Sequence, residues 1–328
     1  MTKTEQIKKV LITGATGFIG SHLARGLVEK GLEVGIIKRD NSDIWRIKGV
    51  LERVKVYNAD LQDAYAILKV ISDFKPDAVF HLAAYYAIEH KSAEIPNMVN
   101  ANVLGTINLL EAARESKVKM FVNTSSCFVY KESKNKLKED GALDPLNLYA
   151  LTKIHAEQAC SFYSEKYGLK CVTFRIFSPY GPGDHRRRLI PHVIKSFLKK
   201  EKSKMTSGKQ KWDFIYVDDI VDAYLALLTR PAFSSRHEIF NIGTGDSVSV
   251  REIVLRLKEI MNSNLEPVWS AVAHRKNEVW FICADTSKAK RLLGWVPKRQ
   301  ILGKGLELTA KWFKIFWKNR GKNEKEQH

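Results

Sequence analysis

One stretch near the start of the chain, KVLITGATGFIGSHL at Lys9–Leu23, constrains the fold more than any other. It opens with a short apolar run rich in β-branched residues, which is typical of a buried parallel strand. Three glycines follow in the spacing G-x-x-G-x-x-G, and a helical pattern begins among them. Glycines let the backbone turn tightly and approach a pyrophosphate, while a helix N-terminus offers unpaired N–H groups and partial positive charge. The stretch therefore predicts a dinucleotide-phosphate site, whose candidate residues are Gly14, Gly17, Phe18, Ile19 and Gly20.

Strand-like segments alternate with helix-like segments through the first half of the chain. The predicted strands after the first are Leu32–Arg39, Val54–Asn58, Ala78–Ala84, Lys119–Ser126 and Cys171–Phe177. The predicted helices between them are Ala64–Phe74, Met98–Ser116 and Leu148–Tyr167. This alternation is typical of α/β proteins and predicts a doubly wound parallel sheet.

The regular alternation ends after Gly183. The elements predicted beyond it are short strands at Phe214–Val217, Ile239–Ile242 and Val279–Ala284 and a helix at Val250–Met261. We expect residues 1–177 to form a dinucleotide-binding domain, to which segments around 213–243 return. Residues 178–212 and 244–328 are expected to form a smaller α+β lobe that binds the substrate.

Composition excludes several classes of protein. The chain has 328 residues, 45% of them hydrophobic, and no apolar run of the roughly 18 residues that a membrane span needs, so we expect a globular protein with no membrane partner. The polar residues before Lys9 do not resemble a signal peptide. The four cysteines show neither C-x-x-C nor metal-ligand spacing, which predicts no metal and a reduced, cytoplasmic protein.

The net charge is +18, but the lysines are scattered along the chain and predict no nucleic-acid partner. An anionic small molecule accounts for part of the excess. The Lys-rich end from Lys311 to Lys325 is expected to be a solvated face and a frayed tail.

The end of the second predicted strand bears on the choice of cofactor. In dinucleotide-binding sheets this strand usually ends in an acid that holds the adenosine ribose and selects NAD. Here Lys38 and Arg39 end the strand and Arg46 follows, and cations at this place suit a 2′-phosphate. We therefore favour NADP(H); Asp40 keeps NAD(H) possible, and the alternative is that the cations only face solvent.

Three residues at the ends of the third and fourth strands complete the predicted cofactor site: Asp60, Leu61 and Ala83. Asp60 has two open interpretations. It could accept a hydrogen bond from the adenine amino group, or it could be a plain turn residue.

A second constellation, Tyr149-Ala150-Leu151-Thr152-Lys153, lies on the helix after the fifth strand. Positions i and i+4 share a helix face, so Lys153 is expected one turn from Tyr149. A nearby ammonium favours phenolate, which lowers the tyrosine pKa and makes it a usable general acid or base. Thr124, Ser125 and Ser126 end the fifth strand, at the edge of such sheets where ligands bind.

With the glycine turn, the serine-bearing strand end and the Tyr149/Lys153 pair in this order, the sequence resembles the extended short-chain dehydrogenase/reductase family, and within it the nucleotide-sugar epimerases, dehydratases and reductases. The resemblance covers nearly the whole chain. Its further matching segments are His81–Ala84, Asn102–Ala113, Arg175–Gly183, Asp213–Asp219, Ala284–Ala289 and Leu293–Trp295.

The resemblance implies a Rossmann-like sheet with a sugar-nucleotide lobe, and a nucleoside-diphosphate sugar as the small-molecule partner. It places the catalytic serine at Ser126 and the general acid/base and lysine at Tyr149 and Lys153, with the lysine also reaching the nicotinamide ribose. The arginine that binds the nucleotide diphosphate corresponds to Arg275. It further implies a homodimer that pairs the helices around 100–116 and 148–167.

Departures from the family pattern narrow the expected reaction. Family dehydratases carry Asp-Glu after their catalytic threonine, where this chain has Cys127 and Phe128, so dehydration lacks its acid and base. Enzymes resembling GDP-fucose synthase place a cysteine one residue later than Cys127, and in a strand that slip turns the thiol to the other face. We therefore expect Cys127 to be a small buried side chain. Arg188 stands where those enzymes keep a histidine.

Two substitutions affect the substrate side. Ser178 and Trp212 replace an asparagine and an arginine that normally touch the phosphates; with Arg188 and Arg275 they are the predicted substrate-binding residues. Diphosphate binding is then expected to use Lys211, His185 or the run Arg186–Arg188, or that run is only a solvent-facing basic loop.

These observations leave three hypotheses. The first is NADP(H)-dependent reduction of a 4-keto-6-deoxy nucleoside-diphosphate sugar by hydride transfer to C4. The second is a nucleoside-diphosphate-sugar 4-epimerase with tightly bound NAD. The third, a catalytically silent dinucleotide-binding protein, is disfavoured by the intact Ser126, Tyr149 and Lys153.

Overall fold

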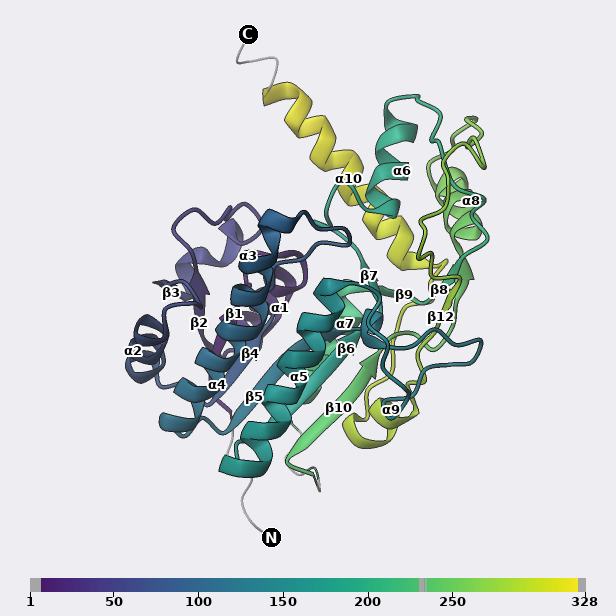
Figure 1. Ribbon diagram of the computed structural model, residues 1–328. Coiled ribbons are helices and arrows are strands. Elements are labelled where there is room, and N and C mark those ends of the chain that lie inside the picture. Colours follow the sequence, from purple (N-terminus) through teal and green to yellow (C-terminus); the bar gives the residue numbers. More distant parts are fainter. Residues whose placement is uncertain (1–6, 230–232, 234, 324–328) are drawn as a thin grey trace.

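The computed structural model describes residues 7–229, 233 and 235–323, so the end of the Lys-rich segment at 324–325 lies outside the described residues. Its centre is a parallel sheet of seven strands (Figure 1). The strands are β1 (Lys9–Thr13), β2 (Glu33–Lys38), β3 (Lys55–Asn58), β4 (Ala78–His81), β5 (Met120–Ser126), β6 (Cys171–Ile176) and β10 (His237–Ile242). Their order is β10-β6-β5-β4-β1-β2-β3, and every pair is parallel. The predicted α/β doubly wound sheet is confirmed, and its order reverses between β1 and β4, the place where such sheets bind ligands.

Helices cover both faces of this sheet, which explains why its central strands β1, β4, β5 and β6 are buried almost throughout. On one face α2 (Ala64–Phe74), α4 (Gly105–Glu115) and α5 (Leu148–Tyr167) enclose a core that includes Leu11 and Phe121. The other face carries α1 (Phe18–Glu29), η1 (Lys48–Arg53), α7 (Val217–Ala226) and α9 (Ser287–Leu293), around residues such as Ile12 and Phe174.

A smaller lobe lies beside the carboxyl edge of the sheet (Figure 1). It contains α6 (Leu189–Leu198), α8 (Val250–Ile260), α10 (Lys304–Asn323), and a three-stranded sheet of β8 (Lys211–Trp212), β11 (Val248–Ser249) and β12 (Phe281–Ile282). A further pair of parallel strands connects this lobe to the large sheet. Its first strand, β7 (Ser178–Tyr180), follows β6 almost directly in the chain and pairs with β9 (Phe214–Tyr216). The lobe has its own core, which includes Phe197, Val254 and Phe313. The exact division into two domains stays a prediction, and β10 pairs with β6 in the large sheet.

Two predicted strands are shorter in the structure by three or more residues. The segment expected at Ala78–Ala84 ends as a strand at His81, and that expected at Val279–Ala284 is reduced to β12. Among the described residues, no helix has the length and apolar character of a membrane span.

The helix predicted over Met98–Ser116 is interrupted, which corrects that prediction. After η2 (Ser92–Glu94), the structure has α3 (Ile95–Val99), a π-helical turn η3 (Asn100–Leu104) and then α4. The π turn aims the buried Asn102 side chain at Tyr85, whose N–H donates to Oδ1 at 2.7 Å. Asn102 Nδ2 also donates to Thr152 Oγ1 of α5 at 2.9 Å. A turn of this kind is common near functional sites, and here it ties the end of β4 to α5.

Candidate active site

The glycine turn has the geometry of a phosphate cradle. Gly14 adopts a φ of +75°, which favours glycine, and a Cβ there would lie 2.5 Å from the Ala83 nitrogen. A Cβ on Gly20 would overlap the Gly14 carbonyl oxygen, so α1 could not approach the turn so closely. Gly17 caps α1, and the following N–H groups of Phe18 and Ile19 have no partner within the helix. These backbone features fit a bound dinucleotide diphosphate.

A buried network fixes this turn to the end of β4. His81 contacts Thr13 Oγ1 through Nδ1 at 2.7 Å and Thr106 Oγ1 through Nε2 at 2.9 Å. Because Thr106 donates its own proton to the Asn102 carbonyl, Nε2 of His81 is the donor and Nδ1 the acceptor. Burial, helped by Lys153, lowers the pKa of His81 to about 3, so the ring is neutral. The Ala83 N–H donates to Thr13 Oγ1 at 3.2 Å, which places predicted residue Ala83 directly against the turn.

The cations after β2 lie in two different environments. Arg39 is exposed, and Lys38 is half-buried, with its Nζ 3.4 Å from the Arg39 carbonyl oxygen. Arg46 instead turns inward: Nε donates to the Gly183 carbonyl at 2.9 Å, and Nη1 to the Thr16 carbonyl at 3.5 Å. The strand-end pair is therefore open to a ligand, whereas Arg46 already binds two backbone carbonyls.

The residues after β3 show a turn and a packing contact. Asp60 Oδ1 accepts from the Gln62 N–H at 3.0 Å, as expected of a turn residue. Leu61 packs against Gly105, where a Cβ would lie 2.8 Å from that of Leu61. Their predicted contacts with the adenosine remain predictions.

The three catalytic candidates come together at the carboxyl edge of the sheet. Ser126 ends β5, and its Oγ accepts from the Phe128 N–H at 3.2 Å. Tyr149 and Lys153 lie one turn apart on α5, which packs against β5, and Lys153 Nζ is 5.9 Å from the Tyr149 ring centre. All three side chains are buried. Their catalytic roles remain predictions.

Burial controls the protonation of this pair. It raises the pKa of the Tyr149 phenol, Tyr86 and Cys127 raise it further, and Arg188 lowers it. It lowers the pKa of Lys153 to about 8. Arg188, rather than the expected Lys153, is thus the cation that opposes the rise at Tyr149.

Sequence reasoning missed Tyr86 and Asp184. The Tyr86 ring meets the Tyr149 ring edge-on, with centres 5.0 Å apart. Asp184 is buried and accepts from Arg188 Nη1 at 3.3 Å, so it holds that guanidinium beside the two tyrosines. The signal for Tyr86 was its position just after the fourth strand, at the ligand-binding edge. Asp184 lies in a loop and offered no such signal.

The strand argument for Cys127 is wrong. The strand ends at Ser126, and Cys127 begins the 3-10 turn η4 (Cys127–Val129), so strand alternation does not set its direction. The thiol is close enough to Tyr149 and Arg188 to affect their pKa values. Cys127 is buried, as expected, and burial raises its pKa, so the thiol is neutral.

Of the predicted substrate residues, Arg188 and Arg275 lie near Tyr86, whereas Ser178 and Trp212 lie in the short strands β7 and β8. Arg188 and Arg275 both lower the pKa of Tyr86, whose rise is due mainly to burial, so they lie near it. The Arg275 side chain is exposed, with Nε 3.8 Å from a Glu89 carboxylate oxygen. Trp212 donates its indole N–H to the Val279 carbonyl at 2.8 Å.

Ser178 is buried in β7. Its hydroxyl has no hydrogen-bond partner within the part of the chain that the structure describes. The predicted substrate contacts of Ser178 and Trp212 remain predictions.

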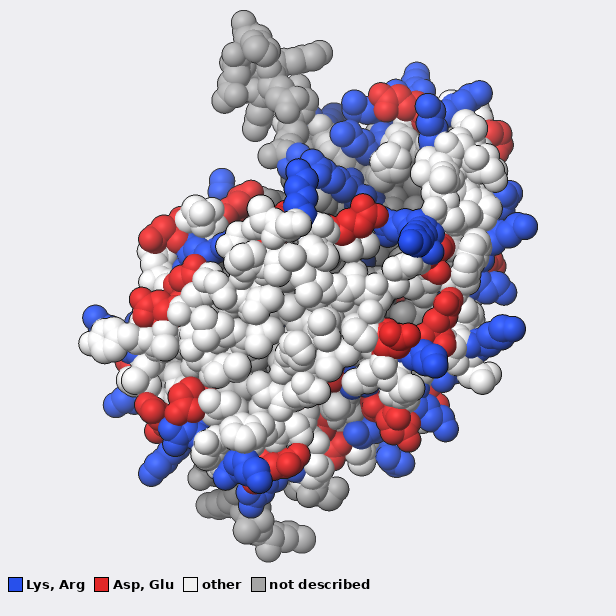
Figure 2. Space-filling view, viewed as in Figure 1, with Lys and Arg blue, Asp and Glu red and all other residues white. Residues whose placement is uncertain are grey.

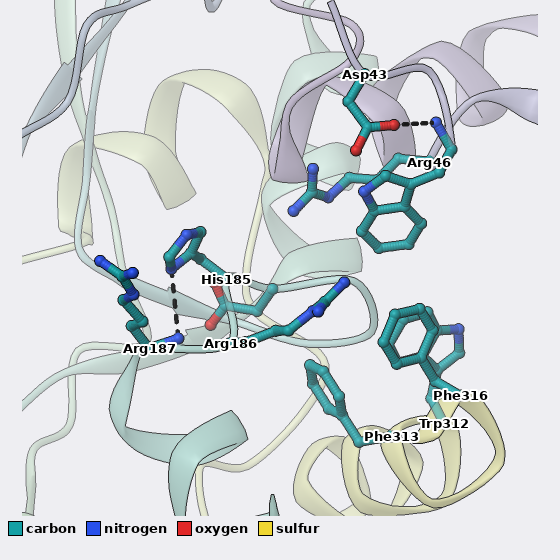
Figure 3. Close-up of a pocket in the computed structure, with 10 residues that line it drawn as sticks. Asp43, Arg46, His185, Arg186, Arg187, Trp312, Phe313 and Phe316 are labelled. Atoms are coloured by element: carbon teal, nitrogen blue, oxygen red, sulfur yellow. Dashed lines mark hydrogen bonds between the residues drawn. The ribbon is translucent and has the colours of Figure 1, made fainter. Parts of the chain in front are cut away.

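A cavity of about 500 Å³ lies between the loop after β2, residues 184–187 and α10. Figure 3 shows Arg46 on one side of it and Trp312 and Phe316 on the other, with Arg186 reaching toward Phe316. The Arg186 guanidinium lies 5.4 Å from the Phe316 ring centre. The basic run is therefore split, because Arg186 and Arg187 line this cavity while Arg188 faces Tyr149. Within the described residues, no group of His, Cys, Asp and Glu could hold a metal ion.

Comparisons with known proteins agree with this geometry. Residues 10–243 match the NAD dependent epimerase/dehydratase family. A UDP-glucose 4-epimerase from Lactobacillus helveticus is 30% identical over 325 residues, covering 93% of this chain and 97% of that protein. A CDP-abequose synthase from Salmonella typhimurium is 31% identical over 292 residues, covering 88% of this chain and 93% of that protein. The crystal structure of UDP-glucose 4-epimerase with UDP-glucose from Thermotoga maritima aligns with a TM-score of 0.87 at 29% identity, covering 94% of this chain and 99% of that one.

Proposed function

Because the chain belongs to the NAD-dependent epimerase/dehydratase family and is an enzyme acting on a nucleotide sugar, we propose that it reduces a 4-keto-6-deoxy nucleoside-diphosphate sugar with NADP(H). The observation that carries this choice is the pair of cations at the end of β2, the half-buried Lys38 and the exposed Arg39, where a 2′-phosphate would gain charge-assisted hydrogen bonds. The similarity to a CDP-abequose synthase supports it.

The proposed roles follow from the buried site. A bound nicotinamide would supply hydride chemistry at C4 of the sugar. Burial keeps the Tyr149 phenol protonated, so Tyr149 donates a proton to the C4 oxygen while Ser126 donates a hydrogen bond to it. Lys153 holds the nicotinamide ribose and stabilises the phenolate that the proton transfer leaves. Arg188, oriented by Asp184, and Arg275 bind the diphosphate.

A second candidate is a nucleoside-diphosphate-sugar 4-epimerase with tightly bound NAD. Its support is the similarity to the UDP-glucose 4-epimerases over nearly the whole chain. The same Tyr149 and Ser126 would remove and return the proton at the C4 oxygen. Lys38 and Arg39 weigh against this candidate, because a free ribose hydroxyl gains less from a cation than a phosphate does.

Titrating NADPH and NADH into the wild type, Arg39→Ala and Lys38→Asp, at low and high salt, tests the cofactor choice. Hydrogen bonds to charged groups contribute about 1.5–3 kcal/mol, so Arg39→Ala should weaken NADPH roughly 10- to 100-fold and leave NADH unchanged. Lys38→Asp should shift the preference further toward NADH. Equal wild-type affinity for both cofactors, unaltered by either change, would refute the proposal.

Product analysis separates the two candidate reactions. The reductase consumes one NADPH for each 4-keto-6-deoxy nucleoside-diphosphate sugar and is inert toward UDP-glucose without added reductant. Interconversion of UDP-glucose and UDP-galactose with no added cofactor, by protein that retains NAD through purification, would identify the epimerase instead.

We also propose a homodimer in the cytoplasm. Exposed apolar residues lie along neighbouring helices: Val99, Leu104, Ile107, Leu151 and Phe162. Figure 2 shows an uncharged area over α4 and α5. An uncharged surface that carries such exposed apolar side chains suits a protein–protein interface. All four cysteines are free thiols, which suits a reducing compartment.

A further inference from the structure

Most of the net positive charge of the chain comes from two segments that belong to the small lobe. Segments 184–211 and 299–323 contain seventeen Lys and Arg against three Asp and Glu, so they carry +14 of the net charge of +18. In the structure these segments include α6 and α10, which pack against each other. Figure 2 shows blue side chains over this end of the small lobe. The diphosphate site requires only a few of these charges.

Helix α10 presents a row of lysines on its outer face. Lys304, Lys311, Lys314 and Lys318 are exposed, at the spacing of three, four and seven residues that places side chains on one helix face. The opposite face, with Leu306, Ala310 and Phe313, is buried in the lobe core. Beside the lysines, Ile315 is 52% exposed. Within the described part of the chain, no acidic side chain pairs with Lys311, Lys314 or Lys318.

A groove of about 740 Å³ with both polar and apolar lining opens beside this row, between α6, the end of α8 and α10. Its apolar lining includes Phe197, Leu198, Ile260, Met261 and Leu265, and residues 262–264 add polar side chains. Lys200, Lys311 and Lys314 also line it, so ammonium groups stand next to apolar side chains. One carboxylate, Glu307, lines it too, and it lies 3.3 Å from Arg256.

We propose that this basic end, formed by the outer face of α10, the end of α6 and the groove between them, docks on an anionic lipid surface. Clustered lysines are attracted to anionic headgroups, and an amphipathic helix adds apolar contacts at the interface. The exposed Ile315 and the apolar side chains of the groove supply those contacts here. Docking of this kind needs no membrane-spanning helix.

The aromatic residues of α10 favour lipid over nucleic acid. Binding of single-stranded nucleic acid uses exposed rings on which bases stack. In α10 the rings stack on one another instead: Trp312 on Phe316 with centres 4.7 Å apart, and Phe313 on Trp317 at 4.7 Å. The exposed apolar side chain among the lysines is aliphatic.

Vesicle sedimentation tests the proposal, with vesicles of phosphatidylcholine alone and of phosphatidylcholine mixed with phosphatidylglycerol. The full-length wild type should sediment with the mixed vesicles at about 0.1 M salt, release them at about 1 M salt, and ignore pure phosphatidylcholine. Each lysine near an anionic surface is worth about a fivefold change in partitioning, so Lys311→Glu, Lys314→Glu and Lys318→Glu together should lose at least about 100-fold. Ile315→Ser should lose less and keep the salt dependence.

A matched triple variant, Lys30→Glu, Lys48→Glu and Lys69→Glu, changes the net charge equally but lies on the large-sheet domain, where all three lysines are exposed. It should keep most of the vesicle binding that the α10 variant loses, and both variants should melt at the wild-type temperature. No sedimentation of wild type with mixed vesicles would overturn the proposal. Equal losses of vesicle binding in the two triple variants would overturn it as well. So would a wild type that binds single- or double-stranded nucleic acid but does not bind the vesicles.

Discussion

At the scale of single residues, the site is defined by what burial does to proton affinity. Tyr149, Lys153 and Cys127 are all shielded from water, and burial favours the neutral form of each. The phenol and the thiol therefore keep their protons, and the ammonium is held less firmly than usual. The proton donor Tyr149 and Lys153, whose amine can lose its proton near neutral pH, therefore lie one helical turn apart.

Tyr149→Phe should lower turnover by about two or more orders of magnitude, the scale of a lost general acid. The affinity for the dinucleotide should stay nearly unchanged, because the glycine turn remains intact. Steady-state kinetics and cofactor titration measure the two effects. Tyr163→Phe is the control, because it removes a phenol of the same helix that bonds Glu111 instead. Retained activity in Tyr149→Phe would move the proton donor elsewhere.

Lys153→Met should abolish activity yet stabilise the ligand-free fold near pH 7. The folded pKa of about 8 lies below the ordinary 10.5, with burial lowering it and Glu157 opposing, so the folded state pays for a buried charge. The cost is full below pH 8, where it amounts to about 3 kcal/mol. Between pH 8 and 10.5 the folded lysine is already neutral while the unfolded one is not, so the cost falls steadily with rising pH and vanishes near pH 10.5. Urea unfolding at several pH values should show the variant's advantage shrinking as pH rises; an advantage independent of pH would contradict this account.

At the scale of elements, the turn between β1 and α1 depends on two glycines for different reasons. Gly14 needs its left-handed backbone, and Gly20 needs the missing Cβ where α1 meets the turn. Both conditions serve the approach of backbone N–H groups to a diphosphate.

Gly20→Ala should therefore destabilise the fold by about 1–3 kcal/mol and weaken the dinucleotide at least tenfold, because the added carbon forces α1 away from Gly14. Thermal unfolding and cofactor titration check both effects. Gly49→Ala is the matched control, since a Cβ there meets nothing within 4 Å, and its stability should change by no more than about 0.5 kcal/mol. Similar behaviour of the two variants would show that the turn tolerates a side chain.

Elements with local signals could be predicted from the sequence. Helix α5 has its predicted bounds, because Asn147 caps its start and Gly168, with a φ of +74°, ends it. The π turn before α4 could not be predicted. It depends on Leu61 against Gly105 and on Asn102 bonding to Tyr85 and Thr152, contacts that only the folded chain creates. Cys127 was misplaced for a related reason, since the hydroxyl of Ser126 caps the 3-10 turn that ends the strand.

At the scale of the whole molecule, two surfaces contrast. The helices α4 and α5 present apolar side chains, and the end of the small lobe presents lysines. They suit different partners, the first a second copy of the chain and the second an anionic surface.

Leu104→Glu with Ile107→Glu should convert the proposed dimer to a monomer in analytical ultracentrifugation. These side chains are 41% and 37% exposed, and carboxylates there would be desolvated on association. Tyr65→Glu on α2, at a side chain 79% exposed, should leave the dimer intact. A wild type that sediments as a monomer at all accessible concentrations would refute the dimer.

One side chain described above, Arg46, links events at the two halves of the site. Its guanidinium joins the Thr16 carbonyl in the glycine turn to the Gly183 carbonyl, next to the loop that holds Asp184 and Arg188. A ligand that shifts one of these carbonyls would alter the hydrogen bond that Arg46 makes to the other, and so the affinity of the site beside it. Such coupling between two sites is reciprocal. If the bound dinucleotide changes the affinity for the sugar nucleotide by some factor, the bound sugar nucleotide changes the affinity for the dinucleotide by the same factor. The sign of that coupling decides whether each ligand lengthens or shortens the residence of the other.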